Sequence, residues 1–161
     1  MSRVPGVVLG LELGLEDDPA AEDVDAVDDG VAAFTIGAAG HGPPRPLAVF
    51  ARQHGTVAAG IHGWTWGGCC ELVALWVSEP LRHRGLGRDL LAAAEDGARA
   101  RGCGQVVLLT HAVQAPGLYA RAGYELVGRV DGYPAGSAAL WFRKWLDPPG
   151  SSGPSDPSAQ P

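Results

Sequence analysis

A strand, turn and helix near the middle of the chain constrain its fold more than any other stretch. Residues 69–78, CCELVALWVS, are apolar nearly throughout, which is typical of a strand buried on both faces. A turn rich in glycine and arginine follows, and from about Gly85 to Arg101 leucine and alanine recur at helical spacing. A buried strand joined to an amphipathic helix predicts a layered α/β domain.

Similar patterns predict the remaining elements. They are a strand at 7–13, an acidic amphipathic helix reaching Phe34, strands at 47–52 and 56–66, a strand at 104–111, a short helix at 115–121, and strands at 123–130 and 138–146. Gly67 and Gly68 predict a two-residue hairpin turn, which would place Trp64 opposite Glu71.

Length and composition bound the class of protein. The 161 residues suit one domain, expected at 1–146, and residues 147–161 lack an apolar pattern and predict a disordered tail. A net charge of −6 argues against a nucleic-acid partner. No run approaches the roughly 20 apolar residues of a membrane span, and no signal peptide is recognisable, so we expect a cytoplasmic protein without a membrane partner.

The three cysteines are not spaced as metal ligands. Cys69, Cys70 and Cys103 form no CxxC pair and no zinc motif. They are interpreted as buried, reduced thiols, and no metal is expected.

The turn LRHRGLGRDLL, residues 81–91, has the chemistry of an anion site. Arg82, Arg84 and Arg88 carry positive charge, and Gly85 and Gly87 let the backbone fold tightly at a helix start that exposes unpaired N–H groups. These features suit phosphate or pyrophosphate. The alternative is a glycine-assisted helix start with solvated arginines. Neither a Walker loop nor a dinucleotide GxGxxG is present at this turn.

Two motifs resemble one known family. RHRGLG is similar, through Arg82, Gly85 and Gly87, to the Q/R-x-x-G-x-G/A signature of the GNAT (Gcn5-related) N-acetyltransferases, and YARAGYE at 119–125 is similar to that family's Y-x-x-x-G-F/Y-E block. The resemblance covers residues 47–146. It implies an α/β fold with a mixed central sheet of about six to seven strands flanked by helices in a single domain.

The resemblance also implies a coenzyme A site, with acetyl-CoA as co-substrate. In the family the turn binds the pyrophosphate, and the preceding strand pairs with the pantetheine arm before the sheet splays. The pyrophosphate turn maps to Arg82, His83, Arg84, Gly85, Leu86, Gly87 and Arg88, and the pantetheine strand maps to Leu75, Trp76 and Val77. Ala112 stands where the family often has asparagine, a contact that Gln114 could replace.

Acetyl transfer to an amine needs a base, an oxyanion donor and an acid for the departing thiolate. Tyr119 resembles the family tyrosine that protonates the sulfur, and a backbone amide near Val77 would hold the oxyanion by analogy. Glu71 has a spacing similar to that of the base in some members. His111, which ends the neighbouring strand, and a water chain are the alternative bases.

The acceptor site is less constrained. His62, Trp64 and Trp66 share one strand face by alternation, and they either line an amine pocket or pack in the core. Tyr133 lies in a loop that would rim such a pocket. We expect transfer of acetyl to a primary amine of a small molecule by direct attack in a ternary complex. The alternatives are a catalytically silent acyl-CoA-binding regulator and acetylation of a protein, peptide or aminoacyl-tRNA. Small domains of the family are often homodimers.

Overall fold

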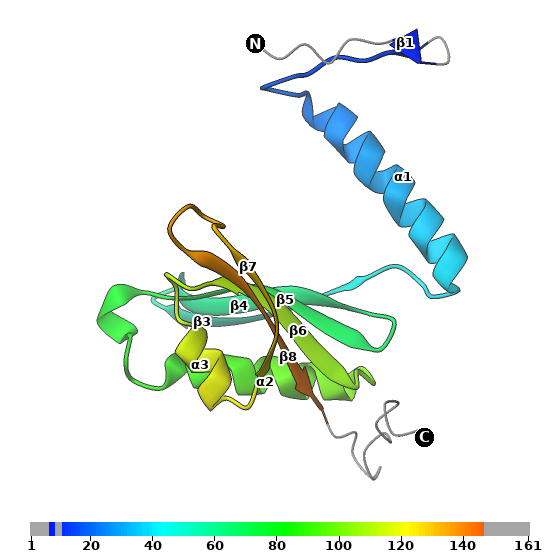
Figure 1. Ribbon diagram of the computed structural model, residues 1–161. Helices are drawn as coiled ribbons and strands as arrows, with labels where there is room; N and C mark the ends of the chain where they lie inside the picture. Colours follow the sequence, from blue (N-terminus) through cyan, green and yellow to red (C-terminus); the bar gives the residue numbers. More distant parts are fainter. Residues whose placement is uncertain (1–6, 9–10, 147–161) are drawn as a thin grey trace, which may run out of the picture. The chain divides into compact units, whose positions relative to one another are not determined.

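The structure, a computed structural model, describes residues 7–8 and 11–146 (Figure 1). The expected tail at 147–161 lies outside these residues. The chain divides into two compact units, residues 1–41 and 42–161, and each is considered by itself.

A six-stranded mixed sheet forms the second unit. Its strands lie in the order β3-β4-β5-β6-β8-β7, and only the β5–β6 pair is parallel. They are β3 (Arg45–Gln53), β4 (Thr56–Trp66), β5 (Cys69–Val77), β6 (Gln105–His111), β7 (Glu125–Asp131) and β8 (Ala138–Trp145). The expectation of a mixed α/β sheet with six to seven strands is confirmed.

Helix α2 (Leu86–Ala100) covers one face of this sheet (Figure 1). Leucine and alanine recur along the buried side of α2, as the sequence predicts; the buried apolar residues are Leu90, Leu91, Ala94 and Ala98. Alternate residues of β4, β5, β6 and β8 form the remainder of the core, among them Ile61, Leu72, Leu108 and Phe142.

Two short helices follow β5 and β6. The 3₁₀ turn η1 (Glu79–Leu81) leads into the arginine-rich turn, and α3 (Pro116–Arg121) leads into β7. No helix in the part of the chain that the structure describes is long and apolar enough to cross a membrane.

The first unit holds a short hairpin, β1 (Val7–Val8) with β2 (Leu11–Glu12), and helix α1 (Ala21–Ala39). The predicted single strand at 7–13 is therefore wrong, since two short antiparallel strands occupy it. The predicted helix is confirmed, and it runs five residues beyond Phe34 before Gly40 ends it in the left-handed conformation, but none of its residues is buried.

Strand β5 also differs from expectation. We expected burial on both faces, but Cys70 and Leu72 are buried while Val73 is 47% and Trp76 51% exposed. Within residues 42–146, α2 covers only one face of β5, so its residues alternate.

Candidate active site

The sheet opens into a gap between its two central strands. Strands β5 and β6 pair over four positions only, from Cys69 opposite Gln105 to Leu72 opposite Leu108. Strand β5 continues to Val77, still paired with β4, and β6 continues to His111, still paired with β8. The backbone of β5 beyond Leu72 is thus unpaired on its β6 side, and the splayed sheet that the family resemblance implies is present.

A β-bulge on β5 marks where the gap begins. Gly63 pairs with Leu72 while His62 pairs with Ala74, so Val73 is the extra residue without a partner on β4. A bulge bends its strand and disrupts the local ladder, and here it coincides with the last residue that pairs with β6. The two distortions together direct β5 away from its parallel neighbour.

Gly63 makes the bulge possible. A Cβ built on Gly63 would overlap the carbonyl oxygen of Glu71 and would lie 2.9 Å from Leu72 Cα. Both obstacles are backbone atoms, so only glycine permits the two strands to approach this closely. Sequence reasoning missed this residue, although an isolated glycine within a strand pattern is the available signal.

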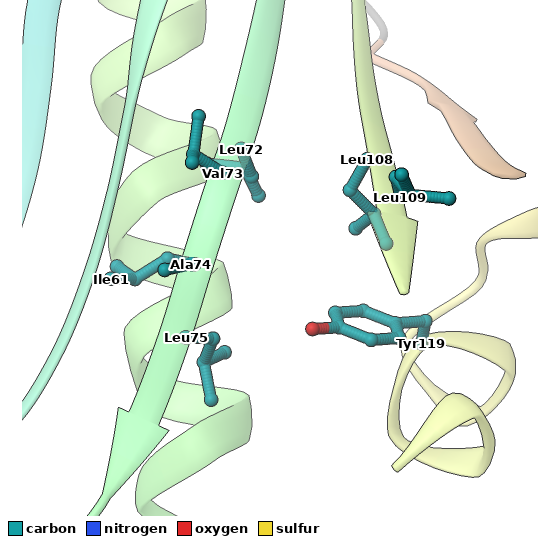
Figure 2. A pocket seen from close by; sticks show the side chains of 8 residues that line it. All are labelled: Ile61, Leu72, Val73, Ala74, Leu75, Leu108, Leu109 and Tyr119. Atoms are coloured by element: carbon teal, nitrogen blue, oxygen red, sulfur yellow. The ribbon is translucent and has the colours of Figure 1, made fainter. Parts of the chain in front are cut away.

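A hollow in the gap is lined mainly by apolar side chains from both sides (Figure 2). Its lining residues are Ile61, Leu72, Val73, Ala74, Leu75, Leu108, Leu109 and Tyr119. Of the three residues expected along the pantetheine arm, Leu75 lines the hollow, whereas Trp76 on the opposite face is half exposed.

Tyr119 projects from α3 into this gap. Figure 2 shows its hydroxyl directed across the gap toward β5. Burial raises the pKa of Tyr119 above its ordinary value. The phenol therefore keeps its proton at neutral pH and is available there as a proton donor.

The arginine-rich turn lies at the end of β5 and the start of α2. Gly85 has φ +87° and His83 has φ +61°, so the chain adopts the left-handed region twice within three residues. The N–H groups of Arg88 and Asp89 donate to Gly85 O, which leaves the amides of Leu86 and Gly87 without intrahelical acceptors. Two N–H groups are therefore available at this turn, and the anion site stays a prediction.

The side chains that are predicted to bind phosphate make different contacts in the structure. Arg82 Nε donates to Val77 O at 3.0 Å, so Arg82 ties the turn to the end of β5. Arg88 is exposed and lies 3.6 Å from Asp89. A Cβ on Gly87 would lie 3.4 Å from Leu118 and 3.8 Å from Leu75, which are ordinary van der Waals contacts with α3 and β5.

Glu71 lies beside the opening of the gap. It pairs with Trp64 on one side and with Val107 on the other, and Leu72, which follows it, makes the last β5–β6 pair. The predicted register of the Gly67–Gly68 hairpin is confirmed, since Trp64 faces Glu71 and Trp66 faces Cys69.

The three aromatic residues of β4 share the sheet face opposite α2. Their neighbours Ile61 and Thr65 are buried, while Trp64 is 38% exposed. Trp66 Nε1 donates to Gly42 O at 2.8 Å, which fixes this indole at the end of its strand.

His111 and Tyr133 lie together although 22 positions separate them. Their ring centroids are 5.2 Å apart and their planes are nearly perpendicular. The structure thus joins a candidate base to the residue expected at the acceptor rim. Gln114 Oε1 accepts from Thr110 Oγ1 at 2.8 Å and from the His111 N–H at 2.9 Å, so this oxygen caps the end of β6.

Burial disfavours ionisation of the three cysteine thiols. Burial raises the pKa of Cys70 to about 12 and also raises the pKa values of Cys69 and Cys103. Among the residues that the structure describes, no three histidine, cysteine or acidic side chains converge to hold a metal ion.

Comparison with known proteins agrees with this geometry. The family model described as the acetyltransferase (GNAT) family matches residues 16–128. The chain belongs to the GNAT family. An acetyltransferase of Agrobacterium fabrum is 30% identical over 131 residues, which cover 81% of this chain and 96% of that protein. Membership confirms the sequence prediction of an N-acetyltransferase.

Two further proteins are similar to this chain in sequence or in fold. Blasticidin-S acetyltransferase of Streptomyces morookaense is 39% identical over 100 residues, covering 57% of this chain and 71% of that one. A crystal structure of an Agrobacterium tumefaciens protein described as an acetyltransferase has a TM-score of 0.80 and 29% identity, and the match covers 84% of this chain and 100% of that chain.

Proposed function

We propose that this GNAT protein transfers the acetyl group of acetyl-CoA to a primary amine of a small molecule, by direct attack in a ternary complex. The observation that carries the proposal is the gap between β5 and β6, which has an anion-binding turn at one end and ionisable side chains beside it. The relative named blasticidin-S acetyltransferase supports a small-molecule acceptor, and so does nourseothricin acetyltransferase. The latter is 28% identical with a TM-score of 0.56 over 63% of this chain and 66% of that one.

The chain's own groups fit acetyl-CoA. The backbone of β5 from Val73 to Trp76 is unpaired on its β6 side and supplies donors and acceptors for the amides of the pantetheine arm. The free amides at the start of α2 and the positive turn suit the pyrophosphate. An aminoglycoside 6′-N-acetyltransferase of the same fold binds coenzyme A in its crystal structure.

Each chemical step has a candidate group at the gap. Glu71 accepts a proton from the acceptor ammonium, directly or through water, and frees the amine to attack the thioester carbon. A backbone N–H of β5, near Val77 by analogy with the family, stabilises the oxyanion, and an N–H near the Val73 bulge is the alternative. As the C–S bond breaks, Tyr119 donates its hydroxyl proton to the departing thiolate. In the alternative assignment, His111 or a water chain is the base that accepts the proton of the ammonium.

Release of coenzyme A against a panel of acceptors tests this function. The panel should hold blasticidin S, a streptothricin-class antibiotic, simple amines, a peptide and a blank without amine. We expect turnover on at least one small amine, and a loss of about 10²-fold or more with Glu71→Gln. Glu125→Gln is the control, because that carboxylate is exposed on β7. Turnover on the peptide alone would refute the small-molecule assignment, and binding of acetyl-CoA without turnover on any acceptor would favour the silent regulator.

A further inference from the structure

The chain's one lysine forms a buried ion pair with a carboxylate of α2. Lys144 Nζ lies 2.7 Å from Glu95 Oε2, Arg99 Nη2 lies 3.6 Å from the same oxygen, and Glu95 is only 5% exposed. The other strongly basic side chains of the chain are all arginines. Removing two charges from water costs several kcal/mol per ion, and a buried pair often stabilises no more than apolar residues do. Folding stability alone therefore does not account for this pair.

Lys144 also contacts the aromatic ring of Tyr124. Its Nζ lies 5.6 Å from the ring centroid, within the range of a cation–π interaction. Tyr124 is 4% exposed, and burial followed by the neighbouring Glu95 charge raises its pKa. Its hydroxyl makes no hydrogen bond of good geometry within the described residues, so ring contacts hold Tyr124 in place.

Tyr124 in turn packs against Tyr119. The two ring centroids are 6.0 Å apart with planes at 72°, and the Tyr124 N–H donates to Tyr119 O at 3.0 Å. Phe142, two residues before Lys144 on β8, also packs against Tyr119, and the two ring centroids are 5.8 Å apart. Helix α3 has only six residues, too few for stability by itself, so packing decides where Tyr119 points.

We propose that Glu95 and Lys144 are positioning residues for Tyr119. The ion pair between α2 and β8 fixes Tyr124, and Tyr124 fixes the ring whose hydroxyl faces the gap. This inference rests on the proposed function, in which Tyr119 is the proton donor.

The test removes both charges together, so that neither is left buried without a partner, and Arg99, which also approaches Glu95, keeps its ion pair with Asp96 at 2.8 Å. In Glu95→Met/Lys144→Met the pair is replaced by apolar groups of similar length, an exchange that is often neutral for stability. We expect an unchanged melting temperature, acetyl-CoA affinity within twofold, and kcat lowered by about tenfold or more because the donor is displaced. The matched control is Glu125→Gln/Arg143→Met, which removes an exposed pair, with N–O distance 2.6 Å, that also involves β8. We expect wild-type kcat there.

A double-mutant cycle separates positioning from general structural support. In a Tyr119→Phe background, loss of the ion pair should lower kcat no further, since the group that it positions is already gone. Tyr124→Phe should retain kcat because the ring remains, whereas Tyr124→Leu should lower it. An additive loss in the Tyr119→Phe background, or wild-type kcat in the folded double variant, would overturn the inference. Wild-type kcat in Tyr119→Phe alone would instead refute the proton-donor role in the proposed function.

Discussion

Substitution of Gly63 by alanine tests how the active-site gap is made. The new Cβ would overlap the Glu71 carbonyl oxygen and lie 2.9 Å from Leu72 Cα, so no side-chain rotation can relieve the clash. Overpacking of this kind costs about 1–3 kcal/mol, and backbone obstacles place Gly63→Ala at the upper end. At about 2–4 °C per kcal/mol, the melting temperature should fall by roughly 5–10 °C.

We expect Gly63→Ala to lower kcat/KM even at temperatures where the variant is fully folded. The strands can accommodate the Cβ only by separating or by giving up the bulge, and either movement shifts the β5 backbone that faces the gap. A displacement of about 1 Å costs on the order of 10²-fold in rate. Circular dichroism melting and a coenzyme A release assay measure the two effects on one preparation at a temperature well below both melting points.

Gly60 on the same strand provides the matched control. A Cβ there would meet Phe50 Cδ1 at 2.7 Å, but Phe50 is half exposed and its ring can rotate away, and the nearest backbone atom, Val49 O at 3.2 Å, needs to shift by only a few tenths of an ångström. We expect Gly60→Ala to change the melting temperature by no more than about 3 °C and kcat/KM by no more than about twofold. Equal melting temperatures and equal kcat/KM values for the two variants would refute the role assigned to Gly63.

Four further measurements follow from the site and the sequence. Glu71→Gln should lower kcat by about 10²-fold with unchanged acetyl-CoA affinity; wild-type turnover from about pH 6 to 9 would assign the base to His111 or water. Gly87→Glu should weaken acetyl-CoA binding at least tenfold, or about 1.4 kcal/mol, measured by calorimetry, and unchanged affinity would contradict a coenzyme site at this turn. Because burial raises the pKa of Cys70 from 9.0 to about 12, an unfolded thiol ionises first as pH rises, so the free energy of unfolding should decline from pH 9 toward 12, and less steeply in Cys70→Ala. Removal of residues 148–161 should leave melting temperature and turnover nearly unchanged, since the sequence there has no apolar pattern that could pack.

Local sequence patterns predicted most helices and strands of the domain and the β4–β5 side of the candidate site. Helical spacing of leucine and alanine located α2, and the paired glycines at 67–68 located the hairpin turn, which fixed Trp64 opposite Glu71. These features depend on residues close in the chain. The same register argument did not predict the bulge at Val73. A bulge changes the count of paired residues without requiring any particular type of side chain.

Contacts between distant residues were not accessible from spacing. Forty-nine positions separate Glu95 from Lys144, and on the sequence Glu95 reads as one more polar position of α2. His111 and Tyr133 were each singled out, yet only the β6–β8–β7 order brings the two rings together. Near the N-terminus, the short apolar run fitted one strand as well as two shorter ones.

Beyond Leu72, strand β5 has one edge without a paired strand, although it lies in the middle of the sheet. Exposed strand edges recruit other chains, and proteins protect their outer edges by several devices. Here continuous neighbours, β4 on one side and β8 beyond β6, flank the inner edge, so a foreign strand has little access to it. On the proposed function, the coenzyme satisfies these backbone groups. Folding and co-substrate binding are then linked, and acetyl-CoA at 100 times its Kd should add about 2.7 kcal/mol to the free energy of unfolding. The cellular half-life of such a protein would follow the acetyl-CoA supply.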